Sequence, residues 1–136
     1  MVNLFYLDKN PYKCATYYCD KHVNKIMIEI CQILNQINYY QIGNNAPYKF
    51  TKTISINLAP FKWASKSKNN YLYCLNLAQG LLNEYKFRFR KKNHKCEKII
   101  KWLYDNIPSN FKYKNRTPFL FTKNYEIYDK TFTNKV

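Results

Sequence analysis

A charged stretch near the start of the chain, residues 17–29, combines the side-chain types that acid–base chemistry needs. Its sequence, YYCDKHVNKIMIE, places Asp20, His22, Lys25 and Glu29 within ten residues. In a helix, His22 and Glu29 are two turns apart, so they point the same way at a separation of about 10 Å. A carboxylate beside a lysine and a histidine can act as an acid–base site. The same pattern is also that of a solvated face with an i, i+4 ion pair, and the spacing alone leaves both interpretations open.

The chain carries a large excess of positive charge. Its 136 residues include 23 Lys and Arg against eight Asp and Glu, which gives a formal net charge of +15. Because such an excess repels itself in a compact fold, it indicates a polyanionic partner such as DNA or RNA. AT-rich codon usage accounts for lysine in place of arginine, but not for so few acids. With two glycines in the whole chain, Gly-rich phosphate loops and dinucleotide fingerprints are excluded.

Three groups of basic residues alternate with aromatic residues. The segment 84–101, EYKFRFRKKNHKCEKIIK, is the most strongly basic. The two smaller groups are Lys62, Lys66 and Lys68 around Trp63, and Lys112, Lys114 and Arg116 near Phe111 and Tyr113. Such mixtures are typical of surfaces that contact phosphates and unstacked bases, although any one group can also be a merely solvated surface. The residues that we expect to bind nucleic acid are Lys25, Lys62, Trp63, Lys66, Arg88, Arg90, Lys91, Lys92 and Lys95.

Helical periodicity determines where the first of these residues lie. Asp8 or Asn10, followed by a proline, predicts a helix start and a short helix over about 11–18. A longer helix is predicted over about 20–40, and its apolar face comprises Val23, Ile26, Met27, Ile30, Ile33, Leu34 and Ile37. The polar face of that helix carries the charged stretch.

The rest of the chain predicts more helices and then a loop-like tail. Pro60 opens a helical pattern that continues to about residue 89, as one helix or as two separated near 67–70. A further helix ends at Pro108. Residues 108–136 are loop-like, aromatic and basic, and we expect an extended tail packed on the body. The sequence therefore predicts one all-α domain over residues 1–136, a compact bundle of three or four main helices.

Cysteine usage and hydropathy indicate an intracellular location, and the cysteine spacing argues against a zinc site. No signal peptide and no apolar run of about 20 residues is visible, so we expect an intracellular protein without membrane association. The five cysteines are odd in number and irregularly spaced, which indicates reduced thiols. Zinc-type ligands are present as Cys14, Cys19, His22, His94 and Cys96. Their spacing lacks a C-x2-C pair and matches no finger pattern, so we expect no metal and no cofactor.

Parts of the chain resemble small uncharacterised proteins of phages and large DNA viruses. The segments that carry this resemblance are MVNLFYLD, YYCDKHVNKIMIEICQIL and NLAPFKWASKSKNNYLYCLNLAQGLLNEYKFRFRKKNHKCEK. The viral proteins open with a similar Asp–Lys–His–Val helix, and later carry a Trp–Ala helix start and a Glu–Tyr–x–x–Arg ending. More distantly, the chain is similar to the pyrimidine-dimer DNA glycosylases of the endonuclease V type, a family of small, basic, all-α proteins.

This resemblance implies roles for particular residues. The family's Asp-x-His, followed seven residues after the His by a catalytic Glu, matches Asp20, His22 and Glu29. By resemblance, Glu29 is the acid–base and transition-state carboxylate, and His22 orients DNA or the Schiff-base intermediate. The nucleophile is the α-amine of Val2, exposed when Met1 is removed. The family extrudes a nucleotide from duplex DNA, cleaves the glycosylic bond at a thymine dimer and nicks the strand by β-elimination.

Three functional hypotheses follow. A DNA glycosylase/AP lyase requires Glu29, His22 and the N-terminus to converge in one basic cleft. A nucleic-acid-binding protein without catalysis, such as a virion or genome-packaging component, predicts basic patches spread over the surface. An interaction protein would dock its aromatic tail, residues 108–128, on a protein partner. The viral resemblance implies the infected host cytoplasm or nucleus, or the virion, as the location.

Overall fold

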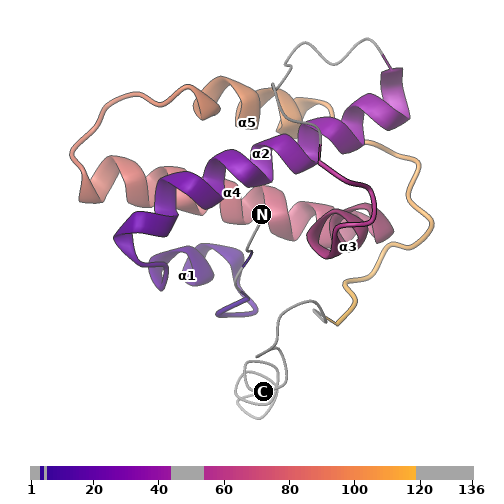
Figure 1. The fold of residues 1–136 in the computed structure, drawn as a ribbon, viewed down its shortest axis with the longest axis horizontal. Helices are drawn as coiled ribbons and strands as arrows, with labels where there is room; N and C mark the ends of the chain where they lie inside the picture. Colours follow the sequence, from indigo (N-terminus) through magenta and orange to yellow (C-terminus); the bar gives the residue numbers. More distant parts are fainter. Residues whose placement is uncertain (1–3, 5, 44–53, 119–136) are drawn as a thin grey trace.

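The computed structural model describes residues 4, 6–43 and 54–118, which form five helices (Figure 1). In chain order these are α1 (Pro11–Thr16), α2 (Asp20–Ile42), α3 (Ala59–Lys66), α4 (Lys68–Arg88) and α5 (Cys96–Asp105). Within these residues there is no strand, and the extended pairing is limited to one isolated bridge between Ser67 and Tyr113. The prediction of a compact all-α bundle is confirmed.

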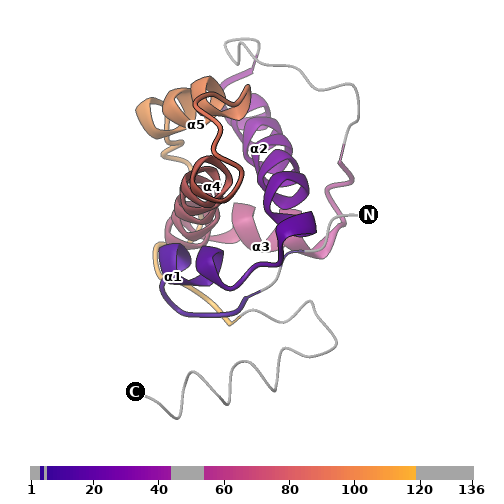
Figure 2. The ribbon, with the colours of Figure 1, turned by 90° about the vertical axis from the view of Figure 1, so that its left-hand side faces the viewer.

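Helix α4 is the central element, and the other four helices pack on it. Figure 2 looks nearly along α4 and shows α5 and α2 on one side of it, α1 on the other side and α3 behind. A helix covered on several sides must be apolar around most of its circumference. This explains the buried residues of α4, which are Asn70, Tyr71, Tyr73, Cys74, Leu75, Leu77, Ala78, Gly80, Leu81 and Leu82.

Local sequence signals account for the ends of α1 and α2. The side chain of Asn10 caps α1 by accepting hydrogen bonds from the backbone N–H groups of Tyr12 and Lys13, and Pro11 occupies the first helical position. α2 ends at Gly43, whose φ of 69° lies in the left-handed region that glycine tolerates. Both predicted helices are confirmed, and their observed ends lie within two residues of the expected ones.

The long helical pattern after Pro60 is divided into two helices, α3 and α4. The break falls at Ser67, whose backbone is extended at φ −141° and ψ 154°. The Ser67 hydroxyl caps α4 by accepting a hydrogen bond of 3.0 Å from the backbone N–H of Asn70. The polypeptide turns here, so α3 packs back against α4 rather than extending it.

Helix α1 lies directly on the backbone of α4 at Gly80. A Cβ atom built on Gly80 would lie 2.8 Å from Cβ of Ala15 and 3.3 Å from Cα of Tyr12. No side chain fits in this space without separating the helices. The glycine therefore fixes α1 against the middle of α4.

A segment after α5, residues 107–118, runs along the α3 end of the bundle (Figure 1), and we call it the strap. The backbone N–H groups of Lys68 and Asn69 donate to the carbonyls of Tyr113 (2.9 Å) and Lys114 (3.0 Å). The side chain of Phe111 packs on the body, 5.5 Å between ring centroids from Tyr71. Residues 119–136, the remainder of the predicted tail, lie outside the described residues.

Candidate functional site

One polar face of α2 carries the residues that the sequence singles out for catalysis. α2 is continuous over Asp20–Ile42, so His22 and Glu29 share a face and lie two turns apart, as predicted. Lys25 lies between them and is exposed, whereas His22 and Glu29 are half-buried. The structure therefore brings these three predicted residues together on one helix.

The carboxylate of Glu29 is only partly accessible to solvent. Its Oε2 atom is buried, and the neighbouring core face of α2 includes the buried Ile26 and Ile30. Withdrawing a carboxylate oxygen from water costs free energy unless protein groups compensate it. Partly buried carboxylates of this kind are frequent at functional sites.

The two ends of this face are bounded by other groups. At the N-terminal end, Nδ1 of His22 lies 3.1 Å from Sγ of Cys19. At the C-terminal end, the side chain of Gln36 pairs with the backbone of Ile54, donating to its carbonyl at 2.5 Å and accepting from its N–H at 2.8 Å. The chain around Ile54 thus covers the last turns of the face. Val2, the third predicted catalytic residue, lies outside the described residues.

Arg88 is used to join three helices. Its guanidinium donates to Oδ1 of Asp20 (3.0 Å) and to the carbonyls of Tyr18 (2.6 Å) and Thr16 (3.0 Å). Its Nε donates to Oε1 of Glu84 at 2.9 Å. These bonds attach the turn between α1 and α2 to the end of α4. They use most of the N–H donors of Arg88, which we had expected to bind phosphate. They also give Asp20 a structural partner.

The most strongly basic part of the sequence forms an exposed tip between α4 and α5, residues 87–95. Arg90, Lys91, Lys92 and Lys95 are all exposed, and within the described ranges none of them forms an ion pair. Phe87 is 81% exposed, the largest exposed fraction among the big apolar residues described. An apolar ring beside unpaired cations is a surface that suits nucleic acid.

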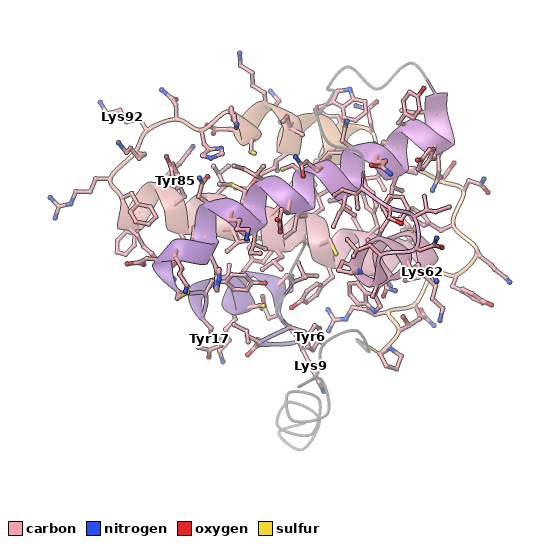
Figure 3. The ribbon with its side chains drawn as sticks, viewed as in Figure 1. Tyr6, Lys9, Tyr17, Lys62, Tyr85 and Lys92 are labelled. Carbon is pink, nitrogen blue, oxygen red and sulfur yellow. The ribbon has the colours of Figure 1, made fainter. Side chains whose placement is uncertain are left out.

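The other two basic groups meet at the opposite end of the molecule. The strap pairs with the start of α4 and so brings Lys112 and Lys114 beside the α3 group that contains Lys62 and Lys66, all of them exposed. Figure 3 places Lys92 and Lys62 toward opposite ends of the long axis. The exposed cations of the tip and those of α3 and the strap therefore form two separate basic surfaces, and Lys25 on α2 belongs to neither.

Trp63 does not belong to the exposed part of these surfaces. It is 5% exposed, and its indole Nε1 donates to the carbonyls of Thr117 (3.2 Å) and Pro118 (3.1 Å). Its ring meets Tyr73 edge to face at 5.8 Å. In this position Trp63 anchors the strap and has no free ring face for a base to stack on.

His94, at the base of the tip, is a polar residue that the site prediction omitted. Its Nδ1 accepts a hydrogen bond of 2.9 Å from the backbone N–H of Cys96, and its Nε2 lies 2.6 Å from Oδ1 of Asn24 on α2. Its ring stands edge to face against Tyr85 at 4.8 Å. Burial and, to a smaller extent, the Lys95 ammonium lower the pKa of His94 below its ordinary value.

The cysteines and histidines are dispersed over the described part of the chain. Throughout residues 6–43 and 54–118, no three His, Cys, Asp or Glu side chains gather to hold an ion. Cys19 pairs with His22, whereas Cys96 contacts the thiol of Cys31 in the core. This contact, together with burial, raises the pKa of Cys31.

The comparisons with known proteins returned no relative. No family model, curated protein or solved structure matches this chain. Among the helices described, none has the length and apolar character needed to cross a lipid bilayer. Function must therefore be inferred from the side chains themselves.

Proposed function

We propose that this protein binds duplex DNA and excises damaged bases from it, as a DNA glycosylase with AP-lyase activity. The observation that carries the proposal is the position of Glu29, a half-buried carboxylate on the same face of α2 as His22 and Lys25. The formal net charge of +15 supplies attraction for DNA, which is needed for any reaction on a duplex.

In this proposal each residue of the α2 face has a separate task. Glu29 stabilises the positive charge that develops on the sugar while the glycosylic bond breaks, and it then moves protons on the covalent intermediate. His22 orients the sugar and its phosphate. Lys25, exposed between them, contacts the DNA backbone.

The proposed nucleophile is the α-amine of Val2 after removal of Met1. An α-amino group has an ordinary pKa of about 7.7–8.0, so a useful fraction is neutral at pH 7. The amine forms a bond to C1′ as the bond from C1′ to the base breaks, and the proton that the amine loses goes to the departing base. The C1′–O4′ bond then opens, with a proton delivered to O4′, and this gives the iminium ion. Loss of a C2′ proton then expels the 3′ phosphate by β-elimination.

Borohydride trapping tests this proposal. We expect the protein to form a covalent adduct with duplex DNA that contains a thymine dimer or an abasic site when borohydride is present. Glu29→Gln should reduce adduct formation and nicking by about 100-fold or more, the usual loss when a general acid–base group is removed. Acetylation of the N-terminal amine should abolish the adduct. Asp105→Asn, which removes an exposed acid from α5, is the matched control and should leave trapping unchanged.

A second candidate function is nucleic-acid binding without catalysis, for example in genome packaging. It is favoured by the two basic surfaces at opposite ends of the molecule, because such an arrangement can bridge or coat nucleic acid. Binding that weakens steeply with salt, without adduct or nick on either substrate, would contradict excision and support this candidate.

A further inference from the structure

A pocket of about 400 Å³ opens between the start of α1, the N-terminal half of α4 and the strap. Its lining residues are Pro11, Asn69, Leu72, Tyr73, Asn76 and Arg116. None of them belongs to α2, so the pocket is separate from the face that carries Glu29. Its volume lies within the range of small-molecule sites, about 300–1,000 Å³.

Among the described residues that line the pocket, Arg116 is the only one with a charged side chain, and aromatic rings hold it. Its guanidinium carbon lies 4.8 Å from the ring centroid of Tyr73 and 5.8 Å from that of Tyr6. One nitrogen, Nη2, donates to the Tyr6 hydroxyl at 3.0 Å. Within the described part of the chain, no carboxylate lies within ion-pair distance of Arg116. The side chain is therefore positioned, and the described residues leave its charge and most of its five N–H donors unoccupied.

Two amides add further donors to the same pocket. Oδ1 of Asn76 accepts hydrogen bonds from the hydroxyls of Tyr104 (2.6 Å) and Tyr12 (3.2 Å), which orients the amide. Its Nδ2 donates to no other residue in the described part of the chain and can serve a ligand. Asn69 uses its backbone N–H for the strap carbonyl of Lys114, and no residue of the described ranges engages its side-chain amide. Arg116, Asn69 and Asn76 thus present donors and one positive charge, and the described lining residues include no acid.

We propose that this pocket binds a phosphate monoester of mononucleotide size, either a free nucleotide or the terminal phosphate of a DNA strand. Three donor side chains match the three peripheral oxygens of a phosphate monoester better than the two of a carboxylate. A pocket of this volume holds more than a bare phosphate. Leu72 and Pro11 supply an apolar wall for the attached group. The proposal does not depend on base excision by the α2 face.

Titration calorimetry on the full chain tests the ligand class. The ligands are inorganic phosphate, dTMP, thymidine, and a short oligonucleotide with either a 5′ phosphate or a 5′ hydroxyl. We expect dTMP to bind more tightly than inorganic phosphate and thymidine not to bind measurably. If the oligonucleotide with a 5′ phosphate binds more tightly than the one with a 5′ hydroxyl, and free dTMP does not bind, the phosphate in the pocket is that of a strand end. If dTMP binds and the two oligonucleotides bind equally, the ligand is a free nucleotide.

Variants locate the site. Arg116→Gln should weaken dTMP binding about tenfold or more, the effect of losing hydrogen bonds to a charged group. Asn69→Asp places a negative charge in the pocket without removing a contact seen in the described ranges, and should abolish binding even if Arg116→Gln folds poorly. Lys13→Gln is the matched control, because Lys13 is an exposed cation on α1 outside the lining. Lys13→Gln should change the affinity for dTMP by less than about twofold.

Two results would overturn the proposal. The first is equal affinity for thymidine and dTMP, because the phosphate would then contribute nothing. The second is an equal loss of dTMP binding in Lys13→Gln and Arg116→Gln, because attraction to the net charge would then explain all of it. Neither result bears on borohydride trapping, so this pocket and base excision can fail separately.

Discussion

The two ends of α4 hold their positive charge in opposite ways. At the C-terminal end, Arg88 donates to the carboxylates of Asp20 and Glu84 and to two backbone carbonyls. At the other end, Arg116 of the strap lies over the ring of Tyr73, and among the described residues no acid pairs with it. A cation with carboxylate partners joins elements of the fold, whereas a cation held by rings keeps its charge for an incoming anion. The following predictions test this contrast.

The largest expected effect is on stability at Arg88. Its side chain is 18% exposed, and Arg88→Gln leaves two acids and the carbonyls of Thr16 and Tyr18 without their donor. Because Asp20 is itself well exposed, we expect a loss of about 2–3 kcal/mol in the free energy of unfolding, below the range for fully buried pairs. Urea denaturation measures this difference. Arg116→Gln should cost no more than about 1 kcal/mol, the value of a partly exposed cation–π contact. Equal losses of unfolding free energy in Arg88→Gln and Arg116→Gln would contradict the contrast between the two ends of α4.

A smaller effect concerns pH and His94, at the base of the tip. Burial lowers its folded-state pKa, so below about pH 6.5 the unfolded chain takes up a proton before the folded protein does. Stability should therefore fall as the pH drops from 7 to 5, and His94 should contribute no slope above that window. Protonation also removes the acceptor for the N–H of Cys96. The difference in Tm between the wild type and His94→Gln should therefore change between pH 7 and pH 5, because only the wild type loses stability through this group. A difference that stays constant over this range would contradict the assignment.

The smallest effect is expected at Arg90, in the tip. Its φ of 50° is left-handed, which costs a non-glycine residue about 1–2 kcal/mol. Glycine removes this strain but adds freedom to the unfolded chain, so Arg90→Gly should stabilise the protein by only about 0.5 kcal/mol. The midpoint of urea unfolding measures the change. A loss of stability would show that the Arg90 side chain is held by the fold, as Arg88 is.

Local signals predicted most helix ends, because the interactions that set them are local. Asn10 and the proline that follows it act within one turn of their own positions, and the structure uses both as expected. The break at Ser67 was left open, because helical periodicity continues on both sides of it. In the structure the Ser67 hydroxyl caps α4 and the Ser67 backbone pairs with Tyr113 in the strap, and periodicity reports neither contact.

The candidate sites show the same division between local patterns, which were predicted, and long-range contacts, which were not. The shared face of His22 and Glu29 follows from helical spacing and was predicted. Arg88 and Trp63 were assigned to nucleic acid because cations and aromatics favour it, but the backbone carbonyls that they bind lie 54 or more positions away along the chain, beyond local pattern. The pocket at Arg116 was not predicted for the same reason, because its lining comes from three distant segments.

The strap has a consequence for the order of folding. The bond from Arg116 to Tyr6 spans 110 positions and that from Thr117 to Asn70 spans 47, so each closes a long loop of chain. Such closures cost entropy and are made after local contacts. The helices can therefore assemble before the strap is docked, and the pocket exists only once docking is complete. A ligand in it would stabilise the closed chain by mass action and would not favour partly folded forms in which the strap is undocked.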